Sequence, residues 1–393
     1  MTSLFLTLGS PALADRGSQL RDRQLLQRIA AAETTAVLAL VGDARAAASV
    51  AALDEDGVRA EAAVFRAADP WTLAAPRSWP ITARSYLSTD AMARLRAMVE
   101  ALRPDVVQVE HSLLLPYVAA LPEGHGARTV ISLHNLGSRQ YETMSRGARS
   151  VAARAGHALK ARLLGRMEAT WIPRYDAAVV VSDFERTLLR RAVPGVDVTV
   201  VPNGIDTKAC RPLDPEPTRE MLFVGNLAYE PNVDGILRFC DEVLPLVTRE
   251  RPDARLTIAG PEPPAAVRDL ARRPGVTVTG RVPDLEPLYR RARVCLAPLR
   301  SGGGTRIKIL EAMAFGRPVV STRFGCEGLA VEDGRDLLVA ESPAEFAAAI
   351  GRLLADESLW HSVRTRARNF VERWHDWDVC VEPLLALHRR LAA

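Results

Sequence analysis

Short apolar runs alternate with amphipathic segments over the first half of the chain. Apolar runs of about four to eight residues are typical of buried strands, and an apolar repeat every three to four residues is typical of a helix. This pattern predicts strands over residues 1–8, 37–41, 105–109, 128–133, 176–181 and 198–201, and helices over 18–32, 91–102 and 184–191. Residues 54–90, with three prolines and two tryptophans, are poorly patterned, and we expect an irregular or short-helical excursion there.

The second half repeats the alternation. The pattern predicts strands over residues 221–224, 255–259, 276–279, 294–299, 318–320 and 333–339, and helices over 233–249, 305–315, 343–355 and 358–373, with a final helix ending at Leu391. Residues 207–219 contain three prolines, a composition typical of a linker. Because repeated strand–helix alternation produces parallel sheets with right-handed crossovers, we predict an α/β fold with two Rossmann-like domains, residues 1–206 and 220–375, facing across a cleft.

Residues 143–170 are expected to form a long basic helical region. Its basic residues are Arg146, Arg149, Arg154, Lys160, Arg162 and Arg166, against the single acid Glu168. Leu159, Leu163 and Met167 recur every four residues and form an apolar stripe. A basic amphipathic helix suits an anionic membrane surface or a phosphorylated acceptor. A solvated charged face above a core-facing stripe explains the same pattern.

The clearest chemical signal is a glycine-rich turn at residues 301–304, between a predicted strand and a predicted helix. Glycine has no Cβ, so backbone amides there can approach a ligand closely, and the helix N-terminus adds partial positive charge. A diphosphate is the usual ligand of such a turn. Lys308 lies one turn into the helix and can reach a phosphate, while Glu311 lies on about the same face and can accept hydrogen bonds from ribose hydroxyls. A plain glycine turn with a surface Lys–Glu pair explains the local pattern equally well.

Polar residues also follow two predicted strands of the first half. Glu110 and His111 follow one strand, and His134 follows the next. Ligands bind at the carboxyl ends of parallel strands, although a hydrogen-bonded structural histidine is the commoner outcome. Gly17 and Ser18 open a predicted helix after the first loop and offer amides for an anion, unless they form an ordinary strand–helix turn.

Composition narrows the function classes. The 393 residues are 48% hydrophobic, which is sufficient for two cores. The charge is balanced at 51 basic against 47 acidic residues and aromatic residues make up only 5%, so nucleic-acid binding is disfavoured. The five cysteines are scattered, without a Cys-x-x-Cys pair or metal-site spacing, which favours reduced thiols in a cytosolic protein.

No segment has the pattern of a membrane span. The apolar runs are all shorter than the ~18 residues that a transmembrane helix requires. Residues 1–14 end in Ala12-Leu13-Ala14, like a signal cleavage site, but the first residues carry no Lys or Arg and the apolar core is short. We therefore interpret the N-terminus as the first buried strand and a loop.

Three motifs resemble one enzyme family. The segment GGGTRIKILEAMAFGRPVVST at 302–322 resembles the donor-binding segment of retaining GT-B glycosyltransferases of family four (group 1). VPNGID at 201–206 resembles that family's interdomain sequence, and FVGNLAYEPN at 223–232 resembles the opening of the second domain in its exopolysaccharide-associated sub-group. The resemblance runs over nearly the whole chain and implies a last helix, 376–391, that packs back on the first domain.

The resemblance also implies roles for individual residues. Donor-binding residues are expected to be Gly303, Gly304 and Thr305 at the phosphates, Arg306 and Lys308 as charges, Glu311 at the ribose, and Asn226, Asn232 and Glu327 around the diphosphate or sugar. Catalytic or acceptor contacts are expected from His134, Glu110 and His111, with Gly17 and Ser18 in the acceptor-side loop.

The chain departs from the family pattern at two places. In the wider family two glutamates bracket seven residues; Glu311 matches the second, but Gly303 stands where the first belongs. The family's Arg and Lys after the first strand of the second domain are replaced by Asn226 and Asn232. The resemblance therefore implies that diphosphate charge is neutralised by Lys308, Arg306 and backbone amides.

The implied function is transfer of a sugar, with retention, from a nucleotide diphosphate sugar to a glycan, lipid-linked or small-molecule acceptor, without a metal or other cofactor. A cytoplasmic protein is expected, peripheral at the inner face of the membrane through residues 143–170. Two alternatives remain open: a nucleotide-sugar epimerase, and a non-catalytic binding protein of glycosyltransferase type. Turnover of the donor without an acceptor, or binding without turnover, separates them.

Overall fold

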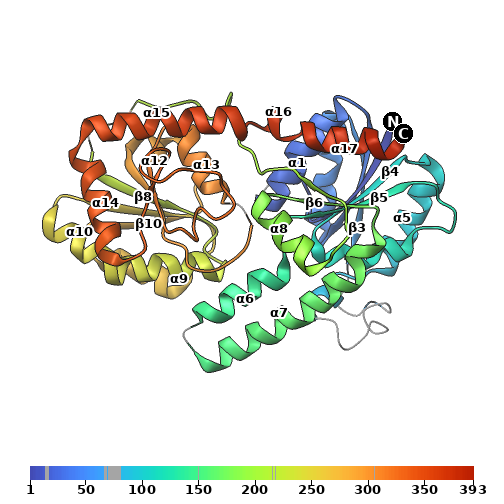
Figure 1. Cartoon of the computed structure of the whole chain (residues 1–393), viewed down its shortest axis with the longest axis horizontal. Coiled ribbons are helices and arrows are strands. Elements are labelled where there is room, and N and C mark those ends of the chain that lie inside the picture. The colour runs from blue at the N-terminus through green and yellow to red at the C-terminus, as the bar shows by residue number, and fades with distance from the viewer. Residues whose placement is uncertain are drawn as a thin grey trace. The chain divides into compact units, whose positions relative to one another are not determined.

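The computed structural model describes residues 1–13, 17–65, 69, 81–148, 150–214, 216, 218–304 and 306–393. The chain divides into two compact units (Figure 1). The first comprises Met1–Asn203 together with Cys380–Ala393, and the second comprises Gly204–Val379. Residues 204–219, which the sequence analysis divided between the first domain and a linker, lie in the second unit.

The first unit is built on a parallel sheet, in the order β3-β2-β1-β4-β5-β6-β7. Its strands are β1 (Thr2–Leu8), β2 (Thr34–Val41), β3 (Val58–Val64), β4 (Val106–Glu110), β5 (Arg128–Leu133), β6 (Ala177–Val180) and β7 (Val198–Val200). Its α-helices are α1 (Gly17–Ala30), α2 (Ala44–Ser49), α4 (Ile81–Arg84), α5 (Thr89–Leu102), α6 (Gly137–Gly147), α7 (Val151–Trp171), α8 (Asp183–Ala192) and α17 (Glu382–Ala392). Short 3₁₀ segments cover Val50–Asp56, Ser112–Ala120 and Ile172–Arg174.

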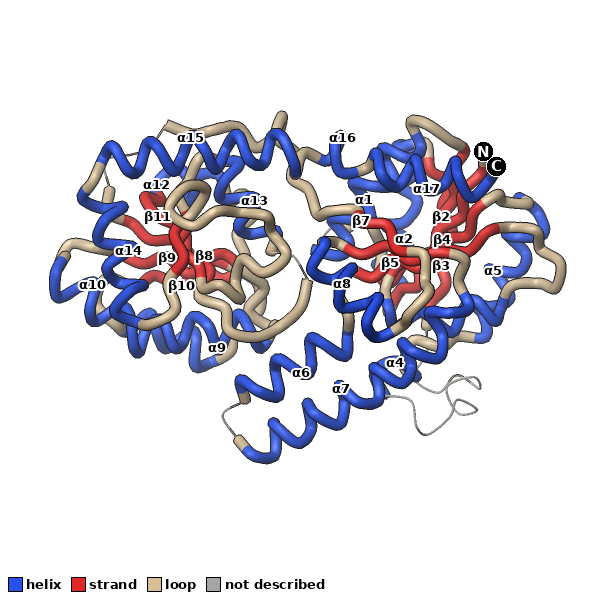
Figure 2. Tube along the Cα trace, viewed as in Figure 1, coloured by secondary structure: helices blue, strands red, loops and turns tan. Residues whose placement is uncertain are grey.

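The second unit repeats this architecture with the parallel order β10-β9-β8-β11-β12-β13. Its strands are β8 (Glu220–Val224), β9 (Arg255–Ala259), β10 (Val276–Gly280), β11 (Ala292–Ala297), β12 (Val319–Ser321) and β13 (Leu338–Val339). Its helices are α9 (Glu230–Arg238), α10 (Leu244–Glu250), α11 (Ala265–Arg268), α12 (Glu286–Arg291), α13 (Ile307–Ala314), α14 (Pro343–Ala355) and α15 (Glu357–Trp374), and α16 (Trp377–Cys380) follows at the junction. Figure 2 shows the strands of each unit in red, flanked by helices in blue. The predicted class, two Rossmann-like parallel-sheet domains, is confirmed.

The expectation of an irregular excursion over 54–90 is wrong for its first part. Residues Val58–Val64 form β3, which pairs in parallel with β2 from Thr35↔Val58 to Val41↔Val64. The strand contains three alanines and Glu61, residue types that are depleted in strands. Among the described strands it lies at the end of the sheet beside β2. Its Val58 and Ala63 are buried, so packing favours a strand that propensity does not predict. Trp71 and Trp79 lie outside the described residues.

Three other predicted elements differ from the structure. The helix predicted over 233–249 is interrupted by a π-helical turn at Phe239–Val243, which separates α9 from α10. The strand predicted over 333–339 is confined to β13. The helical region predicted over 143–170 consists of parts of two helices, α6 and α7, and Ser150 begins α7 by accepting a hydrogen bond from the amide of Ala153.

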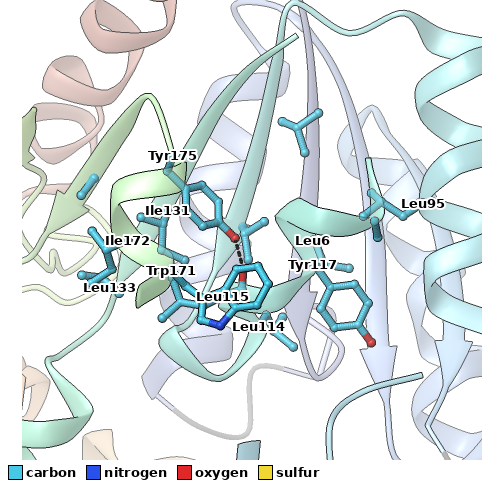
Figure 3. Close-up of a cluster of buried hydrophobic side chains, with 14 of the residues drawn as sticks. Leu6, Leu95, Leu114, Leu115, Tyr117, Ile131, Leu133, Trp171, Ile172 and Tyr175 are labelled. Atoms are coloured by element: carbon cyan, nitrogen blue, oxygen red, sulfur yellow. Dashed lines mark hydrogen bonds between the residues drawn. The ribbon is translucent and has the colours of Figure 1, made fainter. Parts of the chain in front are cut away.

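Each unit has its own hydrophobic core. In the first unit, Figure 3 shows Trp171 and Tyr175 packed with Leu114, Leu115 and Ile131 beside the sheet. The Tyr175 hydroxyl donates to the carbonyl oxygen of Leu115 at 2.8 Å, so the ring is buried without an unsatisfied polar atom. This core fixes β4, β5 and the segment after them, from which the first group of site residues comes.

The sequence pattern predicts reduced cysteines and no membrane-spanning helix. All five cysteines are described, and none of them forms a disulfide. Among the helices of the described residues, none combines the length and the apolar character needed to cross a bilayer.

Candidate functional site

Two clusters of polar side chains lie at the carboxyl ends of strands, one in each unit. The first, here called the carboxylate–histidine cluster, consists of Asp22, Glu110 and His134. Glu110 is the last residue of β4, and His134 directly follows β5, its neighbour in the sheet. Asp22 comes from α1, the helix that follows β1, and β1 pairs with β4 on its other side. Three neighbouring strands thus bring the three side chains to one edge of the sheet.

His134 joins the two carboxylates. Its Nε2 lies 2.8 Å from Glu110 Oε2 and 3.3 Å from Asp22 Oδ1. Both carboxyl groups are almost completely buried, at 2% and 3% exposure. A buried charge requires a partner of opposite sign, so a protonated imidazole between two carboxyl groups is the arrangement that the geometry favours.

The protonation states follow from burial and from these contacts. Burial lowers the pKa of His134, but the charges and hydrogen bonds of Asp22 and Glu110 outweigh it and raise the pKa to about 9. Burial likewise opposes ionisation of Glu110, yet the contacts with His134 and the charge of Arg21 lower its pKa to about 2. For Asp22 burial dominates and raises the pKa to about 6, against the influence of His134. At neutral pH the cluster holds an imidazolium paired with the Glu110 carboxylate.

Arg21 is a further member of this region that the sequence analysis missed, together with Asp22. Its buried guanidinium donates to the backbone oxygens of Val201 and Pro202 and to Asn203 Oδ1, each at 2.9 Å. Its charge also faces Glu110 and Asp22. A signal was present in the sequence: Arg21 and Asp22 lie on the helix stripe that continues through Leu25, where apolar residues are expected.

His111 has an unusual backbone conformation beside the cluster. Its φ is 95°, a region that non-glycine residues rarely occupy, and strain of this kind gathers at functional sites. Its Nδ1 accepts a hydrogen bond from the amide of Leu113 at 3.2 Å. The ring stands edge-on to His134 at 5.8 Å between centroids. Burial, together with the charge on His134, lowers the pKa of His111 to about 3, so this histidine is neutral.

Within the described residues, the ligand atoms of Asp22, Glu110 and His134 lie within 4.8 Å of one another, close enough to share a metal ion. A divalent cation there would have to displace the proton from His134 Nε2 and lie close to the Arg21 guanidinium. Both carboxylates already have cationic neighbours, so the residues fit an ion-paired imidazolium better than a metal centre. Gly17 and Ser18, predicted for the acceptor side, are the first two residues of α1, the helix that carries Asp22.

The second group, here called the lysine–asparagine cluster, consists of Asn226, Asn232 and Lys308 in the second unit. Lys308 lies in the first turn of α13, and its Nζ donates to Asn232 Oδ1 at 2.8 Å. Asn232 Nδ2 in turn donates to the backbone oxygen of Asn226 at 2.8 Å, just beyond β8. Nζ also lies 4.2 Å from the centre of the Phe223 ring, a cation–π distance. The lysine therefore carries a positive charge from α13 to the end of β8.

Gly225 makes room for this lysine, and the sequence analysis did not identify it. A Cβ at Gly225 would lie 2.7 Å from Lys308 Nζ, and a Cβ at Gly260 would lie 1.8 Å from the Gly225 oxygen. Glycines thus directly follow β8 and β9, and they allow close approach of the neighbouring groups. Burial and the charge of Arg306 lower the pKa of Lys308 to about 7, with Glu311 opposing them.

Glu311 has a partner that the sequence did not reveal. The Tyr289 hydroxyl donates to Glu311 Oε2 at 2.7 Å, and the Tyr289 ring stacks on Phe315 with 4.7 Å between centroids. Burial raises the pKa of Glu311, against the hydrogen bond from Tyr289 and the charge of Lys308. The predicted Lys308–Glu311 pair is therefore brought to one region, but each side chain has its own hydrogen-bond partner.

The glycine-rich turn has the backbone conformation that glycine permits. Gly302 has φ 113° and Gly304 has φ 73°, and Arg306 donates to the backbone oxygen of Gly303. Arg306 is buried, so its charge supports the loop from within. Thr305 lies outside the described residues. Glu327 is half-buried in the turn after β12.

Comparison with known proteins identifies the family. Residues 45–209 match the family described as glycosyltransferase family 4, and residues 218–356 match glycosyl transferases group 1. The chain belongs to the group 1, family 4 glycosyltransferases. An uncharacterised 44.6 kDa protein in the cps region of Klebsiella pneumoniae is 28% identical over 40% of this chain and 42% of its own length.

Two further relatives carry functional names. A D-inositol 3-phosphate glycosyltransferase of Acidothermus cellulolyticus is 33% identical, over 49% of this chain and 48% of that protein. A phosphatidyl-myo-inositol mannosyltransferase of Mycobacterium tuberculosis is 29% identical, over 54% of this chain and 59% of that protein. The chain thus spans roughly half the length of these curated relatives.

Solved structures match over the full length and show the GT-B fold. The Anabaena protein HepE, solved with UDP and glucose, has a TM-score of 0.71 at 15% identity, covering 99% of this chain and 100% of that one. Sucrose-phosphate synthase from Thermosynechococcus elongatus has a TM-score of 0.70 at 18% identity, covering 99% of both chains.

Proposed function

We propose that this glycosyltransferase-family protein transfers a sugar, with retention and without a metal ion, from a nucleotide diphosphate sugar to a hydroxyl acceptor. The observation that carries the proposal is the lysine–asparagine cluster beside the glycine-rich turn. Within the described part of the chain, the hydrogen-bond partner of the Lys308 ammonium is the neutral amide of Asn232, and burial together with the charge of Arg306 lowers the pKa of this lysine to about 7. A diphosphate is an anion that such a site suits.

The cluster also accounts for the two asparagines at the family's basic positions. Asn226 and Asn232 carry no charge, but Asn232 directly binds Lys308 Nζ. We propose that Lys308 supplies from α13 the charge that other members supply from the end of β8. Arg306 and the amides of Gly303, Gly304 and Thr305 add positive potential around the leaving diphosphate.

The proposed chemistry depends on stabilising the leaving group. As the bond between the sugar and the diphosphate breaks, negative charge develops on the phosphate oxygen, and fixed positive charges nearby lower the barrier. The same oxygen can take the acceptor's proton, so a front-face reaction requires no separate base. In this proposal Glu311 accepts hydrogen bonds from the ribose hydroxyls, and Glu327 contacts the sugar or a phosphate.

The carboxylate–histidine cluster is proposed to contact the transferred sugar or the acceptor. An imidazolium fixed by Glu110 is a strong hydrogen-bond donor, whereas the neutral His111 ring presents a weaker one. Gly17 and Ser18 are proposed to line the acceptor side of this region.

His134→Gln is expected to lower kcat more than it changes donor affinity.

For the acceptor, we propose a phosphorylated or lipid-linked hydroxyl compound of polysaccharide biosynthesis. Three observations support this: relatives named for inositol phosphate and phosphatidylinositol acceptors, a relative from a cps region, and the basic helix α7. Val151 and Leu159 of α7 are 81% and 58% exposed, and Arg154, Lys160 and Arg162 are exposed on the same helix. Apolar side chains among cations suit an anionic membrane surface.

Vesicle sedimentation tests the membrane part of the proposal. The full chain is expected to bind vesicles with anionic lipid, to lose binding in high salt, and to bind purely zwitterionic vesicles poorly. Replacing Lys160 and Arg162 with Gln is expected to weaken binding, whereas Lys208→Gln, an exposed lysine in the second unit, serves as the matched control. Equal binding by both variants would contradict a role for α7.

The donor proposal is tested first by thermal shift with nucleoside diphosphates and nucleotide sugars, in buffer containing EDTA. A ligand at ~100 times its Kd stabilises the folded state by ~2.7 kcal/mol, which is readily measured. A shift with one base, followed by sugar transfer whose product retains configuration, supports the proposal. Donor turnover without acceptor would favour an epimerase, binding without turnover a non-catalytic protein, and no shift with any compound would refute the donor site.

A further inference from the structure

A chain of buried hydrogen bonds connects the carboxylate–histidine cluster with the last helix of the first unit. His388 lies on α17 and is completely buried. Its Nε2 lies 2.8 Å from Gln108 Oε1, and Gln108 Nε2 donates to Glu110 Oε1. The other carboxylate oxygen of Glu110 binds His134 at 2.8 Å. We call Gln108 and His388 the relay.

The strand period places this relay on one face of β4. Gln108 and Glu110 are two residues apart, so both side chains point to the same side of the sheet. Both are buried, at 0% and 2% exposure. Helix α17 packs against β4 and β7, and its His388 ring lies 6.0 Å from the ring of Phe5 on β1. An apolar side chain could fill the place of His388 without needing any partner.

The direction of the hydrogen bonds is determined by Glu110. An ionised carboxylate only accepts hydrogen bonds, so Gln108 must present its amide nitrogen to Glu110 and its amide oxygen to His388. His388 Nε2 must then carry a proton. If Nε2 lacked its proton, the amide would turn round and set its oxygen against the Glu110 carboxylate, which would then have to be protonated.

The other ring nitrogen of His388 is also engaged. Nδ1 lies 2.9 Å from Glu33 Oε1 and 3.3 Å from Ser3 Oγ, and the Ser3 hydroxyl donates to the same Glu33 oxygen at 2.9 Å. Both ring nitrogens therefore face acceptor atoms, and the proton on Nε2 is the one that Gln108 Oε1 can receive. The polar groups that face His388 come from β1, β4 and the segment after α1.

We propose that His388 is a positioning residue: through Gln108 it fixes the orientation and the ionised state of Glu110, and so keeps His134 protonated. The charged and titratable groups that face Glu110 and His134 directly are Arg21 and Asp22 from α1 and His111 after β4. The relay reaches Glu110 at Oε1, whereas His134 binds the other carboxylate oxygen, Oε2. Its consequence for catalysis rests on the proposed function, but its effect on the charge of His134 does not.

Two substitutions at His388 form a matched pair. Glutamine places an amide nitrogen about where Nε2 lies and retains a donor for Gln108, whereas asparagine reaches only the place of Nδ1. His388→Gln is thus expected to preserve the relay, and His388→Asn to break it. Gln108→Leu breaks the relay from β4 without altering α17. Arg390→Ala removes the α17 contact with Asp197 at 2.6 Å and leaves the relay intact, so it controls for loosened packing of the helix.

The measurement is the NMR titration of ¹⁵N-labelled histidines in the full chain, which has seven histidines, with His134 assigned by its loss in His134→Gln. We expect the His134 midpoint to fall by about one unit or more, a tenfold loss of proton affinity, in His388→Asn and Gln108→Leu. It should stay unchanged in His388→Gln and Arg390→Ala. The same midpoint in all four variants would overturn the proposal; if His388→Asn does not fold, Gln108→Leu decides.

Kinetics separate this inference from the proposed function. Where the wild type transfers sugar, the alkaline limb of its kcat–pH profile is expected to move to lower pH by about one unit in His388→Asn and Gln108→Leu, because the protonated form of His134 is lost that much earlier, with the KM for the donor unchanged. A shifted His134 midpoint in a protein that transfers no sugar would uphold the relay and refute the enzymatic proposal. Unchanged midpoints in an active enzyme would do the reverse.

Discussion

Lys308 lies in surroundings that oppose its charge. Burial and the nearby Arg306 lower its pKa to about 7, although Glu311 acts in the opposite direction. Asn232 satisfies one of its three donors. A bound diphosphate would supply the missing negative charge and raise the pKa of the lysine again. At the residue scale, we therefore expect the protonation of Lys308 to be coupled to binding of the proposed donor.

This coupling predicts a pH dependence of donor affinity. Above pH 7 the lysine of the unliganded protein loses its proton, so binding must restore it, and affinity for the nucleoside diphosphate is expected to fall by up to ~tenfold per pH unit. Calorimetry between pH 7 and 8.5 measures the slope. In Lys308→Arg the guanidinium stays charged throughout, so its slope should vanish; an equally steep slope in that variant would contradict the assignment.

Glu311 makes a separate prediction, because it is proposed to bind the ribose rather than the diphosphate. A hydrogen bond to a charged group contributes ~1.5–3 kcal/mol, so Glu311→Gln should weaken nucleoside diphosphate binding by about tenfold or more. Affinity for inorganic pyrophosphate, measured at pH 6.5 where Lys308 is charged, should change little. Tyr289→Phe removes the donor to Oε2 but keeps the carboxylate and is the matched control. Equal losses for both ligands would place Glu311 at the phosphates instead.

At the scale of elements, the hairpin of α6 and α7 depends on one buried carboxylate. The two helices lie side by side (Figure 1). Glu168 of α7 accepts hydrogen bonds from the amide of Ser138, at 3.2 Å, and from its hydroxyl, at the N-terminus of α6. A Cβ at Gly137 would lie 3.3 Å from the same carboxylate. Burial raises the pKa of Glu168, against the hydrogen bonds from Ser138.

Removing this carboxylate should loosen the hairpin. Glu168→Ala leaves the amides at the start of α6 without their acceptor, and buried groups without partners cost ~1–3 kcal/mol. We expect the free energy of unfolding, measured with urea, to fall by about that amount. Arg166→Ala, two residues away on the exposed face of α7, should change it by less than ~0.5 kcal/mol. Similar effects of the two substitutions would argue that Glu168 does not hold the hairpin.

At the scale of the whole molecule, each unit carries its own core and its own cluster. The proposed donor-binding residues all belong to the second unit, so a nucleoside diphosphate without a sugar should protect that unit alone. Hydrogen exchange is expected to slow in the second unit at the end of β8 and at the start of α13, while amides around Glu110 and His134 keep their rates. Protection that appears first in Met1–Asn203 would contradict this division of labour.

A contact between two side chains could be predicted from the sequence only where the two residues lie close together along the chain. Lys308, Glu311 and the glycine-rich turn lie within one strand–turn–helix unit, so their proximity follows from helix geometry. The pairing of Lys308 with Asn232 and of Glu311 with Tyr289 joins different elements, and no local period reports it. For the same reason Arg21 and Asp22 were overlooked, although charged residues on a buried helix stripe were a usable signal. The edge strand β3 was missed because its alanines have weak strand propensity.

The sequence by itself determined the alternation of strands and helices, the division into two parallel-sheet domains, and the resemblance to family four. Periodicity and turn residues are local properties, and the buried parallel strands left apolar runs that are easily recognised. Only the tertiary structure decided which polar residues meet. It brought Asp22 and Glu110 to His134, carried the charge of Lys308 to Asn232, and connected His388 to the same carboxylate through Gln108. These contacts arise from the order of strands in the sheets. That order depends on pairing between distant segments, so the local sequence of one segment does not determine it.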